Sequence, residues 1–262
     1  MTQPIGVRAV RINGIQIEIM EGGEGRPLLF LHPGIGIDPD APILERLAAQ
    51  ARLLAPVHPG FGGSEAPKSF DSIDDLAYFY LDLIHAFDLA EITLVGVSLG
   101  GWIAAEIAIK CTARLSHLVL CNPVGIKVGG REQRDIADIF AMTESEFFAL
   151  AWRDPAAARH DYKAMPEEDV RKAARNREAT ARYAWSPFMH DPKLKGRLHR
   201  IRIPTLFLWG TNDRILREGY GEAYCAAIPG ARFERIEGAG HFPHLEQPDE
   251  FAKKLFAFTI RK

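Results

Sequence analysis

The segment Gly96-Val97-Ser98-Leu99-Gly100 lies between an apolar run, Ile92-Thr93-Leu94-Val95, and a stretch rich in small residues, Gly101-Trp102-Ile103-Ala104-Ala105-Glu106-Ile107-Ala108. The run predicts a buried strand and the stretch predicts a helix. A serine between glycines at such a junction can occupy a sharp strand-to-helix turn, which lifts its hydroxyl above the edge of a sheet. A side chain at Gly96 or Gly100 would collide across so tight a turn. We therefore interpret Ser98 as a candidate nucleophile rather than as part of a plain glycine turn.

A nucleophilic serine needs a base, and the base needs an acid that orients it. Among nine histidines, His241 follows the flexible sequence Gly238-Ala239-Gly240, between a short apolar run and the terminal helical pattern. Asp213 comes just after the strongly apolar run Leu206-Phe207-Leu208-Trp209, at the strand end where such sites collect. The sequence thus predicts a hydrogen-bonded set in the chain order Ser98, Asp213, His241.

The hydrophobic pattern of the rest of the chain predicts an α/β fold. Alternating residues around Asn13-Gly14 predict a hairpin of strands 7–13 and 15–21. Continuous apolar runs predict parallel strands that are buried on both faces; these runs are 28–31, 53–57, 92–95, 118–121 and 205–209. Helical patterns alternate with them at 41–50, 72–87, 99–109, 218–227 and 243–258. This alternation predicts a mostly parallel central sheet with helices on both faces.

The alternation stops between residues 125 and 200, where no convincing strand is found. Helices are predicted instead at 131–142, 144–152, 155–165 and 167–183. A helical segment at this point of the chain could cover the strand ends and exclude water from a site there.

These features together resemble the α/β-hydrolase superfamily over nearly the whole chain. The resemblance rests on Gly-Val-Ser-Leu-Gly at 96–100, Trp-Gly-Thr-Asn-Asp at 209–213, Gly-His-Phe-Pro-His-Leu-Glu-Gln-Pro at 240–248 and His-Pro-Gly-Phe-Gly-Gly-Ser at 58–64. It implies an α/β-hydrolase core formed by 1–124 and 201–262, with a helical cap inserted at 125–200. It also implies Ser98 as nucleophile, His241 as base and Asp213 as its partner, as in the serine esterase-like branch.

The resemblance further implies an oxyanion hole. One donor is expected to be the backbone N–H of Leu99, the residue after the nucleophile. The second is expected in the loop His32-Pro33-Gly34-Ile35-Gly36 that follows the strand at 28–31. Relatives commonly read His-Gly-x here, so Gly34 falls on the donor position. Pro33 departs from that pattern and has no N–H, which leaves Gly34 and Ile35 as alternative donors.

Candidate pocket residues come mainly from the helical segment. Its large apolar side chains could either line a cavity or hold the helices to the body: Phe140, Phe147, Phe148, Trp152, Tyr183, Trp185, Phe188 and Met189. Our predicted substrate pocket contains His32, Ile35, Trp185, Phe188, His190 and Phe242. Within it, His190 is expected to bind a polar group of the substrate, while His32 is also placed to support the oxyanion loop by a local hydrogen bond.

Composition restricts the possible partners. The formal net charge is −2 with both signs interspersed, so nucleic acid and anionic membranes are not expected partners. No carboxylate joins His241 and His244 at a metal-binding spacing, so no metal site is predicted, and no cofactor is expected. The N-terminus shows no secretory pattern, and the three cysteines have no motif spacing, which predicts a cytoplasmic protein. The oligomeric state stays open.

The predicted function is hydrolysis of a small soluble carboxylic ester, of the carboxylesterase type (EC 3.1.1), by a Ser-His-Asp triad through an acyl-enzyme. A serine at position 98 argues against haloalkane dehalogenases and epoxide hydrolases, which need a carboxylate nucleophile. Three alternatives share the fold and the triad residues. They are a carbon–carbon bond hydrolase of ring-cleavage products, a cofactor-free perhydrolase and a non-catalytic ligand receptor.

Overall fold

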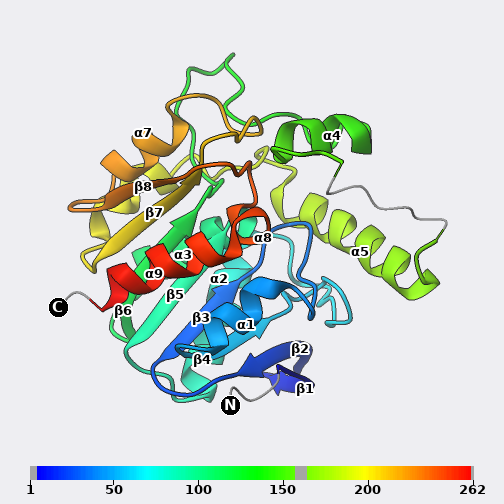
Figure 1. Ribbon diagram of the computed structural model, residues 1–262, viewed down its shortest axis with the longest axis vertical. Coiled ribbons are helices and arrows are strands. Elements are labelled where there is room, and N and C mark those ends of the chain that lie inside the picture. Colours follow the sequence, from blue (N-terminus) through cyan, green and yellow to red (C-terminus); the bar gives the residue numbers. More distant parts are fainter. Residues whose placement is uncertain (1–4, 157–163, 261–262) are drawn as a thin grey trace.

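The computed structural model describes residues 5–156 and 164–260, and its centre is an eight-stranded sheet (Figure 1). The strand order across the sheet is β1-β2-β4-β3-β5-β6-β7-β8. The strands are β1 (Gly6–Ile12), β2 (Ile15–Gly22), β3 (Pro27–Leu31), β4 (Arg52–Pro56), β5 (Ile92–Val97), β6 (Leu115–Cys121), β7 (Thr205–Gly210) and β8 (Arg232–Ile236). Strands β3 to β8 pair in parallel, whereas β2 is antiparallel to both β1 and β4. The predicted mostly parallel sheet is therefore confirmed.

The hairpin that opens the sheet has the predicted turn. Asn13 and Gly14 both have positive φ, 46° and 88°, as a type I′ turn requires. In the sheet centre the residues of β5 are all buried, which explains why its sequence shows no alternation between apolar and polar residues.

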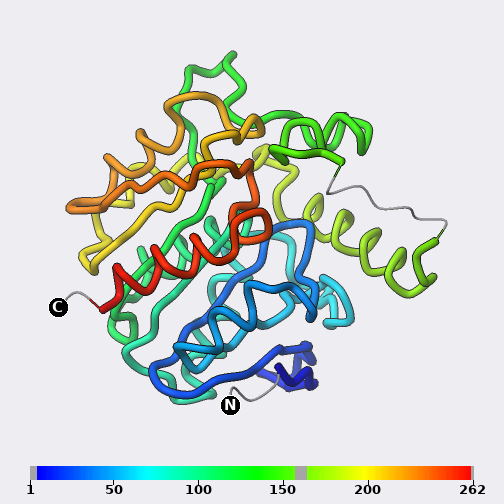
Figure 2. The backbone as a smooth tube through the Cα atoms, viewed as in Figure 1, coloured from blue at the N-terminus to red at the C-terminus, as the bar shows by residue number. Residues whose placement is uncertain are grey.

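Helices cover both faces of the sheet (Figures 1 and 2). On one face α1 (Pro42–Ala48) packs against α9 (Pro248–Thr259), beside the short α8 (Pro243–Glu246). On the other face α2 (Ile73–Ala86) packs against α3 (Leu99–Lys110). Helix α2 begins at a capping box between Ser72 and Asp75, which satisfies N–H groups that the first turn leaves without partners. Helix α7 (Tyr220–Ala226) joins β7 to β8.

The segment between β6 and β7, residues 122–204, carries the remaining helices, and we call it the β6–β7 segment. It contains α4 (Glu144–Ala151), α5 (Glu167–Ala184), α6 (Leu194–Arg197) and the 3₁₀ helix η1 (Leu198–Arg200). Helices α4 and α5 lie beyond the carboxyl ends of the parallel strands (Figure 1).

Two helix predictions were wrong. Residues 131–142 form no helix; instead Ile136 bridges to Leu216 in an extended conformation. The single helix expected at 243–258 is divided into α8 and α9, because Pro248 has no N–H and cannot continue the first helix. Most of the helix expected at 155–165 lies outside the described residues. In the part of the chain that the structure describes, no helix has both the length and the apolar character needed to cross a membrane.

Candidate active site

Ser98 lies at the turn from β5 into α3, in a backbone conformation that the flanking glycines make possible. Its φ is 52° and its ψ is −112°, and its N–H donates to the Cys121 carbonyl at 2.9 Å. A Cβ on Gly96 would lie 2.3 Å from the Gly100 oxygen, and one on Gly100 would lie 2.1 Å from the Leu31 oxygen. Both approaches are shorter than any van der Waals contact, so glycine is required at both positions.

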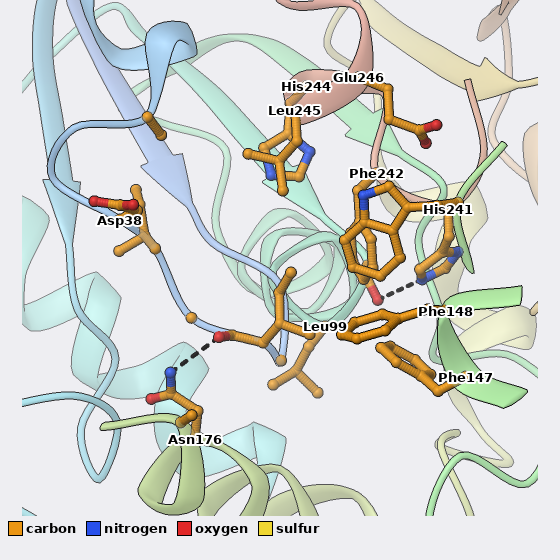
Figure 3. Close-up of a pocket in the computed structure, with 18 of the residues that line it drawn as sticks. Asp38, Leu99, Phe147, Phe148, Asn176, His241, Phe242, His244, Leu245 and Glu246 are labelled. Carbon is orange, nitrogen blue, oxygen red and sulfur yellow. Dashed lines mark hydrogen bonds between the residues drawn. The ribbon is translucent and has the colours of Figure 1, made fainter. Parts of the chain in front are cut away.

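The structure brings the three distant residues Ser98, His241 and Asp213 together. His241 Nε2 lies 2.8 Å from Ser98 Oγ (Figure 3). On the other side of the ring, His241 Nδ1 lies 2.8 Å from Asp213 Oδ2. The side chains of His241 and Asp213 are 3% and 1% exposed. The carboxylate accepts the Nδ1–H hydrogen bond, which leaves Nε2 free to accept the serine proton. This arrangement can activate a hydroxyl.

The Asp213 carboxylate is held by four hydrogen-bond donors. Oδ1 accepts from the N–H groups of Ile215 at 2.8 Å and Leu216 at 3.2 Å. Oδ2 accepts from Asn122 Nδ2 at 2.6 Å in addition to His241. The sequence analysis missed Asn122, although its place directly after a buried strand was a usable signal.

The loop that carries His241 is fixed by both the core and the β6–β7 segment. The N–H of His241 donates to the Ala151 carbonyl at the end of α4, at 2.6 Å. The N–H of Gly240 donates to Glu246 Oε1 at 2.7 Å. A Cβ on Gly240 would lie 2.3 Å from the Ala151 oxygen. Burial raises the pKa of the Glu246 carboxyl, although the backbone N–H groups of Gly240 and Arg153, which donate to this carboxyl, act to lower it. Helix α4 therefore helps to place the imidazole.

The loop after β3 forms a turn closed by a hydrogen bond from the Gly36 N–H to the Pro33 carbonyl, at 2.9 Å. His32 lies behind this turn, and its Nδ1–H donates to the same carbonyl at 2.7 Å. A trans peptide directs its C=O and N–H to opposite sides. Because the Pro33 oxygen faces the His32 ring, the N–H of Gly34 points away from it.

His32 is completely buried and does not line the cavity, so its prediction as a pocket residue was wrong. Its ring stacks on His58 with the centroids 3.6 Å apart. His58 donates its N–H to His32 Nε2 and its Nε2–H to the His32 carbonyl, at 3.0 and 2.9 Å. Burial lowers the pKa of His32 to about 4, and burial together with the neighbouring His32 ring lowers the pKa of His58 well below its usual value. Both rings are therefore neutral supports for the loop.

A cavity of about 1650 Å³ opens above Ser98 and is lined by Gly34, Leu99 and the predicted pocket residues Ile35 and Phe242. Aromatic side chains of the β6–β7 segment gather beside His241 (Figure 3). The segment contributes Phe140, Phe147, Phe148, Trp152 and Met189 to the lining. The lining residues that sequence reasoning missed include several polar ones: Asp38, Asp169, Lys172, Asn176, Arg177 and Thr180.

Three further pocket predictions were wrong. Trp185 is 58% exposed, and neither it, Phe188 nor His190 lines the cavity. His190 instead pairs with Gly125 in a bridge and donates from Nδ1 to the Phe188 carbonyl at 2.8 Å. Their loop turns at Met189, whose φ is 55°. This turn directs Met189, rather than the residues on either side of it, into the cavity.

Another buried histidine lies in the cavity wall. His244, on α8, is 3% exposed, and within the described residues its Nδ1 has no hydrogen-bond partner. Burial, with smaller effects of His241 and His32, lowers its pKa to about 3. Among the residues described, no group of three or more histidine, cysteine or acidic side chains could hold a metal ion.

The chain was compared with known proteins. The family model of the alpha/beta hydrolase family matches residues 28–254. One relative is the 2-hydroxy-6-oxo-6-(2'-aminophenyl)hexa-2,4-dienoic acid hydrolase of Metapseudomonas resinovorans, 24% identical, with 97% of this chain and 91% of that protein covered. Another is the pimeloyl-[acyl-carrier protein] methyl ester esterase of Photobacterium profundum, 25% identical, with 90% and 95% covered.

Among solved structures, the 2-hydroxy-6-oxo-6-phenylhexa-2,4-dienoate hydrolase from Rhodococcus sp. superposes with a TM-score of 0.79 at 20% identity, covering 100% of both chains. This superposition shows a shared fold, and at 20% identity it shows the fold alone. The match of the family model extends from β3 into α9. The chain therefore belongs to the alpha/beta hydrolase family.

Proposed function

We propose that this protein is a serine hydrolase that cleaves a small carboxylic ester through an acyl-enzyme. The observation that carries the proposal is the hydrogen-bonded chain from Ser98 Oγ through His241 to Asp213, with both links at 2.8 Å. A hydroxyl bonded to an imidazole that a buried carboxylate orients is the arrangement that activates serine for acyl transfer.

The reaction proceeds in two steps. His241 Nε2 takes the proton of Ser98 Oγ as that oxygen bonds to the ester carbonyl carbon, while Asp213 stabilises the imidazolium. His241 then gives the proton to the leaving alcohol as the ester bond breaks. In the second step a water molecule loses a proton to His241, attacks the acyl carbon and releases the carboxylic acid, and the proton returns to Ser98.

Two backbone N–H groups are proposed to hold the oxyanion. Leu99 is the first residue of α3, so its N–H has no partner within the helix and lies at the positive end of the helix dipole. Gly34 lines the same cavity, and its N–H points away from the buried His32. We therefore favour Gly34 over Ile35 as the second donor.

We further propose that residues 125–200 act as a cap that excludes water from the reacting groups. Helix α4 holds the His241 loop, and the aromatic side chains of this segment give the cavity an apolar wall beside the imidazole. Cys111, Cys121 and Cys225 are free, which suits the reducing cytoplasm that we propose as its location.

A second candidate is carbon–carbon bond hydrolysis, because one relative is named as a hydrolase of a dienoic acid. Such an acid brings a carboxylate into the cavity. Among the described lining residues, however, acidic side chains outnumber basic ones: Asp38, Asp40, Glu144, Asp154, Asp169 and Glu246 against Arg153, Lys172 and Arg177. This balance of charge favours the neutral ester.

Short-chain p-nitrophenyl esters and a vinylogous diketone acid, each assayed with wild-type protein and with Ser98→Ala, test the proposal. Wild-type protein should turn over the esters, and Ser98→Ala should lose about 10⁴- to 10⁶-fold in kcat. A small organophosphate should label Ser98, as mapped by peptide mass spectrometry. Ester turnover that survives in Ser98→Ala would overturn the proposal. Turnover of the diketone acid alone would favour the second candidate.

A further inference from the structure

Two polar residues of α5 contact the loop that carries Gly34, and the sequence analysis assigned no function to either of them. Thr180 Oγ1 lies 2.9 Å from the Gly34 oxygen. Asn176 Nδ2 donates to the Ile35 oxygen at 2.9 Å (Figure 3). The two residues are four positions apart, so they lie on the same face of the helix. Both are buried, with exposed fractions of 5% for Thr180 and 9% for Asn176.

The fit between α5 and this loop is so close that it depends on glycine. A Cβ on Gly34 would lie 2.8 Å from Thr180 Oγ1. A Cβ on Gly36 would lie 2.2 Å from Asn176 Nδ2, and the φ of Gly36 is 93°. Neither loop position can therefore take a larger residue while α5 stays where it is.

The hydroxyl of Thr180 has two carbonyls within reach but only one hydrogen to donate. The backbone carbonyl of Asn176 is 2.8 Å away and belongs to the same helix. In an α-helix this carbonyl already accepts a hydrogen bond from the backbone N–H four residues later. The Gly34 oxygen lies outside any helix or strand. We therefore assign the Thr180 hydroxyl as the donor of a hydrogen bond to the Gly34 carbonyl.

The same helix also holds the neighbouring loop after β4. Asn176 Oδ1 accepts from the Gly62 N–H at 2.9 Å, and the Tyr183 hydroxyl donates to the Pro59 oxygen at 3.0 Å. That loop is joined to the first one by the paired rings of His58 and His32. Asn176 thus uses both ends of its amide, which fixes the amide orientation, and α5 holds the two loops as one unit.

We propose that Asn176 and Thr180 are positioning residues, which fix the loop 33–36 in the conformation that presents the Gly34 N–H to the oxyanion. The inference rests on the proposed function. The carbonyls of Gly34 and Ile35 are tied to α5, so the Gly34–Ile35 and Ile35–Gly36 peptides cannot rotate without breaking a hydrogen bond to the helix. The adjoining Pro33–Gly34 peptide carries the Gly34 N–H, and its carbonyl accepts from Gly36 and His32, so the helix fixes this peptide through its neighbours. The second oxyanion donor is therefore complete only while α5 is docked against the core.

The test compares Thr180→Val, which keeps the shape but loses the hydroxyl, with Thr180→Ser, which keeps the hydroxyl. A second variant, Asn176→Leu, removes the other hydrogen bond. Glu178→Ala is the control, because Glu178 lies on the same helix and pairs at the surface with Arg182 at 3.0 Å. Thermal unfolding of every variant establishes that it is folded.

The variants are assayed with an ester that the wild-type protein hydrolyses. Thr180→Val and Asn176→Leu should each lower kcat/KM by up to about 100-fold, because a misplaced Gly34 N–H weakens binding of the transition state. Most of the loss should be in kcat, with KM little changed. Affinity for a trifluoromethyl ketone, which forms a tetrahedral adduct with serine, should fall in parallel, whereas affinity for the product alcohol should stay constant. Thr180→Ser and Glu178→Ala should behave like wild type.

The wild-type protein and Ser98→Ala report on the proposed function independently of α5. Absence of serine-dependent turnover in wild-type protein would overturn that function and this inference with it. An active wild type with folded and equally active Thr180→Val and Asn176→Leu variants would overturn the inference alone. So would a loss confined to KM, or a ketone affinity that does not change.

Discussion

Asn122 shows how one buried side chain can orient the acid of the candidate site. It is completely buried, with a φ of 40°. Its Oδ1 accepts from the Gly210 N–H at 3.0 Å, which assigns the amide orientation, and its Nδ2 donates to Asp213 Oδ2 at 2.6 Å. Strands β6 and β7 are thus tied together at the point where the carboxylate must stay in place for His241.

Replacing Asn122 by leucine should weaken catalysis, and it should also lower the free energy of unfolding, because leucine is strained at this positive φ and the Gly210 N–H loses its acceptor. We expect Asn122→Leu to lower kcat/KM about 10-fold, because the carboxylate loses a donor worth on the order of 1.5 kcal/mol and gains freedom to turn away from the imidazole. The measurement is ester kinetics beside thermal unfolding. Asn212→Leu, at an exposed position next to Asp213, is the matched control. Wild-type kinetics in a folded Asn122→Leu protein would contradict this role.

Sequence reasoning found the residues with strong local signals and missed those that act through packing. Ser98, His241 and Asp213 lie beside glycines or strand ends, which single them out. Asn176 and Thr180 lie on a largely polar helix, where Ala179, Tyr183 and Ala184 mark the buried face but nothing in the sequence indicates that polar side chains of that face contact the loop after β3. His190 was misplaced because the turn at Met189 reverses the direction of neighbouring side chains.

At the scale of elements, residues 131–142 show why a helical pattern can fail. Asp135 is buried and accepts hydrogen bonds from Lys127 Nζ at 2.9 Å and from the N–H groups of Val128 and Gly129 at 2.8 and 2.9 Å. Its backbone carbonyl accepts from the Arg217 N–H at 2.9 Å. These tertiary contacts hold the chain extended against the loop after β7, and they outweigh local helix propensity.

Asp135→Asn should therefore destabilise the protein, because charge-assisted hydrogen bonds lose their carboxylate. Burial opposes ionisation of Asp135, but the hydrogen bonds from Lys127, Val128 and Gly129 outweigh it and lower the carboxyl pKa. We expect a loss of about 2 kcal/mol in the free energy of unfolding at pH 7, measured in urea. Glu132→Gln, at an exposed position of the same segment, is the control. Equal stability of the two variants would contradict the assignment.

For the whole molecule, the pattern of apolar runs predicted strands β3 to β7 of the central sheet, because these parallel strands are largely buried on both faces. The edge strand β8 has only one buried residue, and no strand was predicted there. The cavity could not be predicted in the same way. Its walls depend on how the β6–β7 segment meets the strand ends, a contact between distant parts of the chain that leaves no periodicity. The core is therefore predictable from patterns within single segments of the sequence, whereas the cavity depends on contacts between segments that are far apart in the sequence.

The buried histidines give the whole molecule a predictable sensitivity to acid. Burial lowers the folded-state pKa of His32 to about 4 and that of His244 to about 3, whereas a histidine in the unfolded chain has a pKa of about 6.5. Below that pH the unfolded chain binds protons that the folded protein does not. Stability is therefore complete above pH about 6.5 and declines as the pH falls towards these folded-state values, by up to about 1.4 kcal/mol per pH unit for each histidine.

Urea unfolding at pH 7, 6 and 5 measures this decline, and His244→Leu should make it shallower by the contribution of one proton. His244 suits the test because its ring lies among Phe30, Phe242 and Phe251, and its Nδ1 has no partner within the described residues. The control is Phe251→Leu, a nearby core change that alters no titrating group and should lower stability equally at every pH. If His244→Leu and wild type lose stability in parallel between pH 7 and 5, the ring is not held neutral by burial.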